Sequence, residues 1–526
     1  MRMVSKFLLA VILSGVCCLE AAAQCPARPP AGSVVQDALS LYSQSGVLNA
    51  GLTMGYSVDT YGYSHYCYKY ATSTGTAEAP TLRLNPGDQI VLDVTDDIKG
   101  DGLHSMSAMD RMIVPTGAAC GDGGAGSLQS TNVHFHGLNV PPVCHQDDVL
   151  TTLIQPGSPA FEYNIKIPTT EPPGLYWYHP HVHGFTEFQV NGGAAGALVV
   201  EGMEKVHPEV TGLTERVFVV RQQYLVPWVP GPYQLTLNFQ VAASPGTPSP
   251  IIQMAPGAKE FWRVANATLQ DFMPLQVWFN GTPQQLQLIA LDGYPVAEPR
   301  YETTILVPPA GRAEFIVPAP PAGVSAQFVS LSYSTGPTGN PDFEQSLANV
   351  ELTTNSAARR QPKTPVSTAK VATGNLKFSG LKNLTPSTAR KLYFSEEFGG
   401  TNGPIQFYIT VDGQKQQVFE PNEKPMITTK VGAVEDWTIE NRALETHAFH
   451  IHQIHFQMLE VNGKEVADQD LRDTIEIPYW SGSGPYPSVK VRMDFRDPTI
   501  AGTFVFHCHI LLHEDLGMMH KIQVLP

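Results

Sequence analysis

Charged residues are scarce in this 526-residue chain: they make up 15% of it, where about 25% is usual for a soluble domain. Lysine and arginine number 33 against 48 aspartates and glutamates, which gives a formal net charge of −15. A chain with such a deficit of basic residues is not built to bind a phosphate backbone, so nucleic acid is excluded as its natural partner. Apolar residues still make up 42%, enough for a large core, and this excludes a disordered chain.

The chain also lacks an apolar run of the 18 or more residues that would span a bilayer. The stretch from Phe7 to Leu19 has 13 residues, follows Arg2 and Lys6, and precedes three alanines at 21–23. A positive start, a short apolar segment and small residues at its end predict a signal peptide over residues 1–23. We therefore expect an exported protein, periplasmic or secreted, with no membrane span.

Cysteines are few: seven in all, of which Cys17 and Cys18 fall inside the predicted signal peptide. The five that remain are an odd number, so in an oxidising compartment one thiol is expected to be engaged in something other than a disulfide. Cys508, which lies between two histidines, is the candidate. The other four allow three pairings. Sequence proximity alone favours Cys25 with Cys67 and Cys120 with Cys144.

Helical periodicity over ten or more residues is rare. Short alternating apolar runs, broken by glycine, proline and aspartate, recur instead, for example at residues 89–94, 197–200, 216–220, 314–317, 406–411 and 521–525. This pattern predicts an all-β chain of sandwiches.

Two changes in composition mark domain boundaries. One lies near residue 202, and the other is a polar stretch over residues 353–375. At roughly 150 residues per domain, we predict the following division: a first domain over residues 24–203, a second over 204–352, a linker over 353–375 and a third over 376–526.

Histidine is abundant, with 17 residues. A random order would give a His-x-His pair about 0.5 times. The sequence has five such pairs: His134/His136, His179/His181, His181/His183, His450/His452 and His507/His509. Residues two apart on a strand face the same side, so each pair presents two imidazoles together, as a metal site requires. A loose histidine-rich surface tract is disfavoured because the pairs lie in strand-like, aromatic surroundings.

The last of these pairs encloses a cysteine. Strand alternation turns Cys508 to one side and its neighbours His507 and His509 to the other, so the tripeptide can contact two metal sites. A thiolate with two imidazoles and a distant thioether is the ligand set of an electron-transfer copper site. Cys508, His513 and Met518 supply three of these ligands. His447, which lies outside the His-x-His pairs, is the candidate for the fourth.

Four segments, taken together, resemble the four copper motifs of the multicopper oxidases. They are HFHG at 134–137, WYHPH at 177–181, HAFHIH at 447–452 and HCHILLHEDLGM at 507–518. Their order and spacing are similar to those of the three-domain, laccase-like members. Residues 257–266, 292–293 and 309–315 are similar to that family's copper-free middle domain. The resemblance implies three cupredoxin-like Greek-key β-sandwich domains, with copper at the first and third.

The resemblance also implies four copper ions, one of type 1, one of type 2 and two of type 3, and a ligand for every position. The type 1 ligands would be His447, Cys508 and His513, with Met518 axial; the type 2 ligands His134 and His450; the type 3 ligands His136, His179 and His509 for one ion and His181, His452 and His507 for the other. A family member that had lost its metal would show gaps in this set, and none is present.

Such an enzyme takes electrons one at a time from a donor and passes four of them to O2, which becomes water. His513 is expected to be the ligand through which the donor's electron enters. Reduction of O2 also consumes protons, which requires carboxylates beside the trinuclear group. Glu514 and Asp147, or its neighbour Asp148, match positions of proton relays in similar enzymes. The alternative for each is an ordinary solvated acid.

The electron donor is the open question. The first hypothesis is a laccase-like oxidase of phenols and aromatic amines, and the second is a metal oxidase acting on Cu(I), Fe(II) or Mn(II). A copper electron carrier without oxidase activity is disfavoured by the complete set of eight histidines, and a copper nitrite reductase by the paired type 3 histidines. We expect a monomer whose partners are O2 and a small electron donor.

Overall fold

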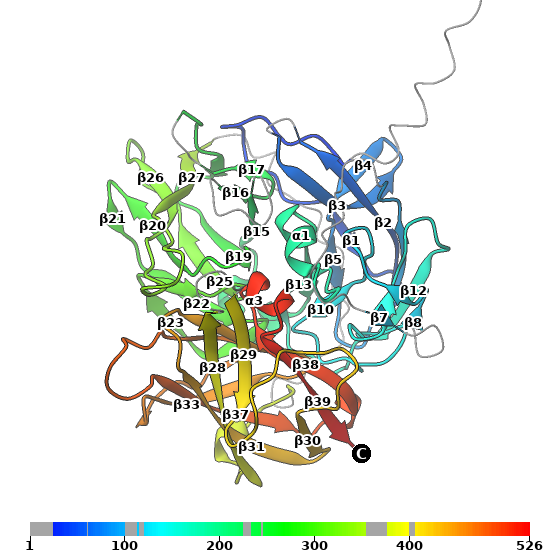
Figure 1. The fold of residues 1–526 in the computed structure, drawn as a ribbon. Coiled ribbons are helices and arrows are strands. Elements are labelled where there is room, and N and C mark those ends of the chain that lie inside the picture. The colour runs from blue at the N-terminus through cyan, green and yellow to red at the C-terminus, as the bar shows by residue number, and fades with distance from the viewer. Residues whose placement is uncertain are drawn as a thin grey trace, which may run out of the picture.

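The computed structural model describes residues 25–59, 62–99, 113–114, 120–224, 233–242, 246–353, 376–398 and 405–526. The predicted signal peptide and all but the first residue of the predicted linker lie outside these ranges. Along the chain, the described strands form three successive pairs of β-sheets, which lie around a common centre (Figure 1). The prediction of three cupredoxin-like β-sandwiches is confirmed.

In the first domain the two main sheets have five strands each. One has the order β1 (Ser40–Tyr42), β5 (Thr81–Leu84), β14 (Gly196–Val200), β13 (Gly174–His179) and β10 (His134–His136). The other has the order β12 (Phe161–Lys166), β6 (Gln89–Asp96), β2 (Val47–Val58), β3 (Ser64–Thr72) and β4 (Gly75–Glu78). Two small ladders pair β7 (Ile113–Val114) with β9 (Gly124–Ala125) and β8 (Cys120–Gly121) with β11 (Thr152–Leu153).

The second domain has a larger sheet of seven strands. Its order is β17 (Gln240–Val241), β16 (Tyr233–Leu237), β15 (Thr214–Tyr224), β19 (Lys259–Ala267), β25 (Arg312–Pro318), β22 (Leu286–Leu291) and β23 (Tyr294–Glu302). The facing sheet has the order β18 (Ile251–Met254), β27 (Gln345–Leu352), β26 (Ala326–Ser330), β20 (Met273–Phe279) and β21 (Thr282–Pro283), with β24 (Ile305–Val307) also paired to β20.

The third domain repeats the arrangement. One sheet has the order β29 (Ile405–Val411), β28 (Thr388–Phe398), β31 (Ala433–Asn441), β37 (Ser488–Phe495), β33 (Phe456–Val461) and β34 (Lys464–Glu465), with β35 (Leu471–Arg472) paired to β33. The other has the order β30 (Ile427–Lys430), β39 (Met519–Leu525), β38 (Gly502–Cys508), β32 (His447–Ile451) and β36 (Thr474–Ile477).

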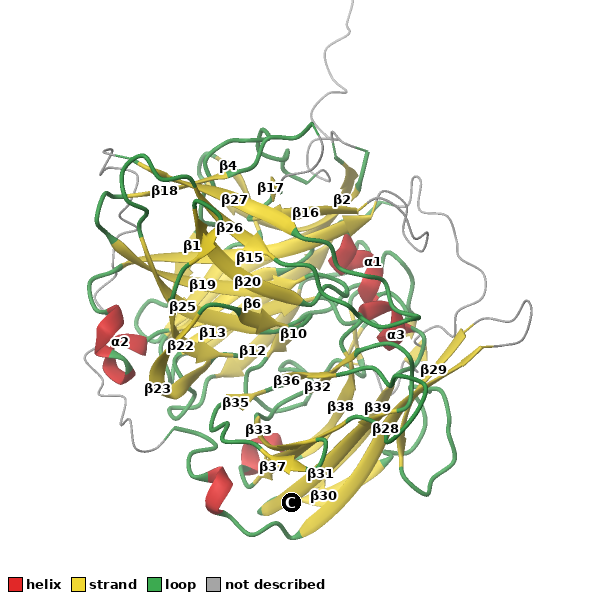
Figure 2. Ribbon diagram, turned by 90° about the vertical axis from the view of Figure 1, so that its left-hand side faces the viewer, coloured by secondary structure: helices red, strands yellow, loops and turns green. Residues whose placement is uncertain are grey.

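Helices are short. In the described parts of the chain they are α1 (Thr186–Asn191), α2 (Met203–Val206) and α3 (Leu511–Asp515), with 3₁₀ turns at Pro208–Val210, Leu381–Asn383 and Pro498–Ile500. Helices α1 and α3 come from the first and third domains and lie side by side (Figures 1 and 2). No helix among the described residues is long and apolar enough to cross a membrane.

Strand β13 shows how the domains pack. Its side chains alternate between two cores: Tyr176 and Tyr178 face the first domain's own core, whereas Leu175 and Trp177 pack against β15 and β19 of the second domain. Both faces are therefore buried, which is why this segment is apolar and aromatic throughout instead of alternating with polar residues. The strand that ends at His179 is thus fixed between two domains.

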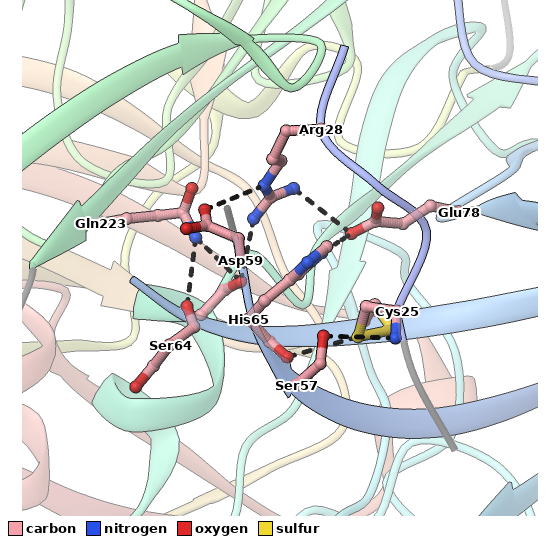
Figure 3. Close-up of a disulfide and its surroundings, with 10 residues drawn as sticks. Cys25, Arg28, Ser57, Asp59, Ser64, His65, Glu78 and Gln223 are labelled. Carbon is pink, nitrogen blue, oxygen red and sulfur yellow. Dashed lines mark hydrogen bonds and ion pairs between the residues drawn. A yellow bond between two sulfur atoms is a disulfide. The ribbon is translucent and has the colours of Figure 1, made fainter. Parts of the chain in front are cut away.

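Two disulfides tie down the first domain. Cys25 is bonded to Cys67 and Cys120 to Cys144, which confirms the pairing favoured by proximity. Beside the first bond, the buried guanidinium of Arg28 lies between Asp59 and Glu78, with Nε 3.6 Å from an Asp59 oxygen and Nη1 3.5 Å from a Glu78 oxygen (Figure 3). The first described residues are therefore anchored by a covalent bond and a buried ion-pair network. Cys508 is the free cysteine of the described residues, as predicted.

Candidate metal centre

Four strands and the loop after β13 bring the eight predicted trinuclear histidines together. Strand β10 pairs antiparallel with β13, so that His134 lies opposite His179, and β32 pairs antiparallel with β38, so that His450 lies opposite His507. The first pair of strands belongs to the first domain and the second to the third. All eight side chains are at most 2% exposed. The site therefore lies buried at the contact between two domains.

Three imidazoles converge on one point. Nε2 of His507 lies 3.5 Å from Nε2 of His181 and 3.3 Å from Nε2 of His452. Nitrogens at these separations can all reach one ion at about 2.0–2.1 Å, the usual metal–imidazole distance. Burial lowers the pKa of His181 to about 4, so its ring is neutral at pH 7 and its nitrogen lone pair is available. These are the three residues predicted to share a type 3 ion.

Three of the other histidines direct one nitrogen outward and the other into the site. Nδ1 of His134 lies 3.0 Å from an Asp147 oxygen, Nδ1 of His179 lies 2.8 Å from its neighbour's carbonyl, and Nδ1 of His450 lies 2.9 Å from the Asp473 carbonyl. Their Nε2 atoms are buried and have no hydrogen-bond partner among the described residues. An outer nitrogen bound to a carboxylate or carbonyl and an inner one left open is the arrangement of metal-ligating histidine.

His136 is oriented the other way round. Its Nε2 lies 3.4 Å from an Asp473 oxygen, and its buried Nδ1 has no partner among the described residues. His509 has neither nitrogen partnered within the described residues, and its ring centre lies 5.2 Å from that of His136 and 5.7 Å from that of His179. The predicted set is thus gathered in one place. Ligand atoms of His134 lie within 4.8 Å of those of two different groups, so the division of these five imidazoles among ions stays a prediction.

A second group lies on the other side of β38. Sγ of Cys508 is 3.6 Å from Nδ1 of His447 and 3.9 Å from Nδ1 of His513, and the two nitrogens are 3.3 Å apart. Burial raises the pKa of the Cys508 thiol, so a thiolate at this position needs a cation beside it. The three ligand atoms form a triangle that a single metal ion can fill.

Met518 and Phe407 border this group. Met518 is fully buried; its N–H donates to the His513 carbonyl at 2.8 Å, and its carbonyl accepts from the Cys508 N–H at 3.0 Å. These two backbone bonds fix the thioether residue next to both ligands. Phe407 of β29 stacks on the His513 ring, with centroids 4.1 Å apart. The Phe407 ring therefore covers one face of His513, which is 4% exposed.

Both predicted proton-relay carboxylates are buried against the histidines. Oxygens of Glu514 lie 3.1 Å from Nδ1 of His507 and 3.4 Å from Nε2 of His181. Burial would raise the pKa of Glu514, but these two imidazoles outweigh it and hold the pKa well below its usual value. Asp147 accepts from Gln453 Nε2 at 2.5 Å and from the Phe135 N–H at 2.9 Å. Burial raises its pKa to about 7, although these hydrogen bonds oppose the shift.

Several polar residues around the site were not found by sequence reasoning. Asp473 contacts two of the histidines, Gln453 fixes Asp147, and Arg312 binds Asp473. On the other side, a Glu396 oxygen lies 3.4 Å from Nε2 of His447, and a Glu445 oxygen lies 3.7 Å from Nε2 of His513. No motif spacing marks these residues, because each reaches the ligands through a tertiary contact. Only Glu445 lies near a predicted ligand in the sequence, two positions before His447.

Burial raises the pKa of Glu445 to about 8, and the neighbouring Glu396 carboxylate adds to the shift. Glu396 and Glu445 thus place one acidic side chain beside the outer nitrogen of each imidazole in the Cys508 group. The chemistry of the donor set, a cysteine sulfur with two imidazoles in one group and eight imidazoles in the other, fits copper.

Comparison with known proteins agrees with this geometry. Two family profiles, both described as multicopper oxidase, match residues 127–205 and 399–526. A multicopper oxidase of Staphylococcus haemolyticus is 25% identical over 465 residues, covering 86% of this chain and 83% of its own. A solved multicopper oxidase from Campylobacter jejuni, described as a metallo-oxidase, superposes with a TM-score of 0.67 at 22% identity, covering 95% of this chain and 96% of its own.

A laccase-like multicopper oxidase from an Ochrobactrum species, described as active towards lignin model compounds, superposes with a TM-score of 0.61 at 19% identity. It covers 93% of this chain and 100% of its own. The two solved structures establish the shared fold.

Proposed function

We propose that this chain, a multicopper oxidase by its family profiles, relatives and fold, couples one-electron oxidation of small phenolic or aromatic amine donors to the four-electron reduction of O2 to water. One observation carries the proposal. The tripeptide 507–509 places Cys508 in one ligand group and the histidines on either side of it in the other. Electrons accepted at one group thereby have a covalent route to the other.

Four copper ions fit the ligands present. His447, Cys508, His513 and Met518 would hold the type 1 ion; His134 and His450 the type 2 ion; His136, His179 and His509 one type 3 ion; His181, His452 and His507 the other. When bound, copper supplies one-electron redox chemistry and the binding of O2.

The protein's own residues position and insulate these groups. His513 is the ligand nearest the surface in the Cys508 group, at 4% exposure, so a donor resting beside its ring can pass an electron inward. Phe407 covers the opposite part of the ring and excludes water there. The trinuclear histidines, by contrast, are sealed between domains. Organic donors are therefore kept away from the site where O2 reacts.

Glu514 and Asp147 are proposed to move the protons that water formation consumes. Glu514 contacts His507 and His181, and Asp147 contacts His134, so each carboxyl lies against a different part of the histidine group. Neither is exposed. Imidazoles that bind copper through one nitrogen and a hydrogen-bond partner through the other have no lone pair to spare for proton transfer, which leaves the carboxyls to do it.

Glu514→Gln tests this role. The amide has nearly the carboxyl's shape but cannot carry a proton, so reoxidation by O2 of the fully reduced enzyme should slow by about 10²-fold or more. Reduction of the blue centre by a phenol should stay at the wild-type rate. Stopped-flow absorbance measures both. Glu187→Gln, which changes another buried glutamate on the adjacent helix α1, is the matched control, and reoxidation equal in all three proteins would exclude Glu514.

The donor class is tested by steady-state O2 uptake of the copper-loaded protein with a dimethoxyphenol, Cu(I) and Fe(II) in parallel. We expect the phenol to be oxidised with four donors consumed per O2. An enzyme that uses neither the phenol nor an aromatic amine, but consumes O2 with a metal ion, would reject the phenolic assignment.

A metal oxidase is the second candidate, and Glu396 and Glu445 are the observation that favours it. Their carboxylates lie beside the outer nitrogens of His447 and His513, where a donor cation would be both bound and close to a ligand. Because the pKa of Glu445 is about 8, a cation must displace its proton, and the charge-assisted contact that then forms contributes about 1.5–3 kcal/mol.

Glu445→Gln should then raise the KM for Fe(II) or Cu(I) roughly ten- to a hundredfold and leave the KM for the phenol almost unchanged. Glu440→Gln, in the same domain but paired with Arg442, serves as the control. Parallel loss with phenol and metal ion would mean that Glu445 supports the copper ligands instead of recognising the donor.

We further propose that the protein acts as an exported monomer, periplasmic or secreted. Residues 1–23 have the composition of a signal peptide, and the two disulfides suit an oxidising compartment.

A further inference from the structure

Arg312, at the start of β25 in the second domain, contacts all three domains although its domain holds none of the predicted copper ligands. Its guanidinium is 1% exposed. Nη1 and Nη2 donate to the two Asp473 carboxylate oxygens of the third domain at 2.8 and 2.6 Å. Nε donates to the Leu175 carbonyl of the first domain at 3.3 Å. The Ala310 and Asp292 carbonyls of its own domain accept the other two N–H groups at 3.2 and 2.8 Å. All five donors of the guanidinium are thus used.

Asp473 in turn contacts two of the histidines. Its Oδ1 lies 3.4 Å from Nε2 of His136, and its carbonyl oxygen lies 2.9 Å from Nδ1 of His450. The Thr474 hydroxyl donates to Oδ1 at 2.8 Å and lies 3.2 Å from the same nitrogen of His450. One aspartate therefore sets the outer hydrogen bonds of one histidine from the first domain and one from the third.

Asp292 completes the connection between the second and third domains. Its Oδ1 accepts from the Arg312 N–H at 2.8 Å, and its Oδ2 lies 3.3 and 3.2 Å from the N–H groups of Asp473 and Thr474. The main chain on each side of the ion pair is thus held by the same carboxylate. Arg312 and Asp473 cannot shift independently of each other.

The surrounding chain is shaped to fit this ion pair. Gly137 follows His136 with a φ of +91°, and a Cβ added there would lie 2.4 Å from Arg312 Nη2 and 2.8 Å from an Asp473 oxygen. Only glycine fits this backbone conformation and this approach. On the other side, a cavity of about 380 Å³ between the second and third domains is lined by Asp292, Arg312 and Thr474. Thr474 therefore borders both this cavity and His450.

We infer that Arg312 is a positioning residue for the trinuclear site: through Asp473 it orients His136 and His450, one a predicted type 3 ligand and the other a predicted type 2 ligand. The inference rests on the proposed function, since it concerns the ligands assigned there. It gives the copper-free domain a part in the metal centre. Without the guanidinium, Asp473 would be a buried carboxylate free to turn towards the cavity. His136 would then lose its outer partner, and the main-chain carbonyl that contacts His450 would lose the ion pair that anchors its residue.

The second domain offers a matched control in Arg263 of β19. Arg263 is 2% exposed, is paired with Glu314 and Glu215, and lies in the strand next to β25. Glu314 also accepts from the Leu175 N–H of the first domain at 2.7 Å. Arg263 therefore shares the burial, the ion pair and the link between domains, but its pair does not contact the histidines. A purely structural role for Arg312 predicts that the two arginines behave alike.

The experiment compares Arg312→Lys and Arg263→Lys with the wild type, all loaded with cupric ion. Copper per chain, the blue absorption and the type 2 electron paramagnetic resonance signal are measured. We expect Arg312→Lys to keep the blue absorption but to lose at least one copper per chain or to shift the type 2 hyperfine splitting. Lysine keeps one charge but cannot hold both oxygens of Asp473. Arg263→Lys should match the wild type.

A wild-type copper count and type 2 signal in Arg312→Lys, or the same defect in both variants, would overturn the inference. If Arg312→Lys does not fold, Thr474→Val decides, because it removes only the hydroxyl between Asp473 and His450; an unchanged type 2 signal then overturns it. Fewer than four copper ions in the wild type would instead reject the proposed function, and the inference with it. The two failures are therefore distinguishable.

Discussion

Cys508→Ser is expected to abolish the intense blue absorption and donor oxidation together while the protein stays folded. The serine hydroxyl is not a thiolate, so the triangle of Cys508, His447 and His513 loses its soft ligand and its charge-transfer absorption. The covalent route from this group to His507 and His509 loses its sulfur as well. Donor-driven O2 uptake should fall below detection.

Copper analysis and circular dichroism separate this result from misfolding. Cys508 is the free cysteine of the described residues, so serine leaves both disulfides intact, and the trinuclear histidines on the opposite side of β38 should keep their copper. We expect three ions per chain instead of four. Met518→Leu, which removes a distant thioether and keeps its volume, should retain an intense blue band. A blue Cys508→Ser protein, or one that still oxidises phenols, would contradict the ligand assignment.

The sequence was sufficient for those features that repeat locally. Alternation along strands predicted the β-sandwich class, as in β6, where every second residue of QIVLDVTD is buried. The same alternation predicted that Cys508 and its neighbouring histidines would face opposite ways, and the distances on the two sides of β38 agree. Nearest-neighbour pairing of the cysteines was also correct, because both disulfides close short stretches of chain.

Residues that contact another domain do not produce a local sequence pattern of this kind. Arg312 and Asp473 are 161 positions apart. The local sequence around each of them gives no sign that the other is its partner. Gln453 reaches Asp147 across 306 positions, with a backbone φ of +59° that no spacing rule predicts. A buried polar side chain is recognisable only when its partner is known, and the partner comes from the packing of sandwiches against one another. Sequence reasoning therefore found the histidines and the cysteine that the structure brings together, and it missed most of the residues that orient them.

The short helices were missed for a different reason. Helices α1 and α3 have six and five residues, too few for a helical period to appear in the pattern of apolar positions. Tertiary contacts hold them instead. Asp515, the last residue of α3, accepts from the N–H groups of Gly184, Thr186 and Glu187 at 2.9, 3.2 and 2.8 Å. The start of α1 in the first domain is thereby fixed to the end of α3 in the third.

Asp515→Ala should give the largest loss of stability among single substitutions considered for this chain. The side chain is 4% exposed, and alanine would leave three buried N–H groups without acceptors, each costing about 1–3 kcal/mol. The contact between the first and third domains would weaken beside the predicted copper ligands. Allowing for relaxation, we expect a loss of roughly 3 kcal/mol or more, seen as a fall in apparent Tm of about 5 °C or more by scanning calorimetry.

Asp515→Asn is the control for charge. Burial, together with the neighbouring Glu514 and Glu187 carboxylates, raises the pKa of Asp515 well above its usual value. This shift favours the neutral carboxyl, which the asparagine amide resembles in shape. The asparagine keeps an oxygen for two of the three N–H groups and should lose less than half as much stability as the alanine. An alanine variant with wild-type Tm would show that water replaces the carboxyl. A fall as large in the asparagine variant would show instead that the negative charge, and not the set of hydrogen bonds, joins the two helices.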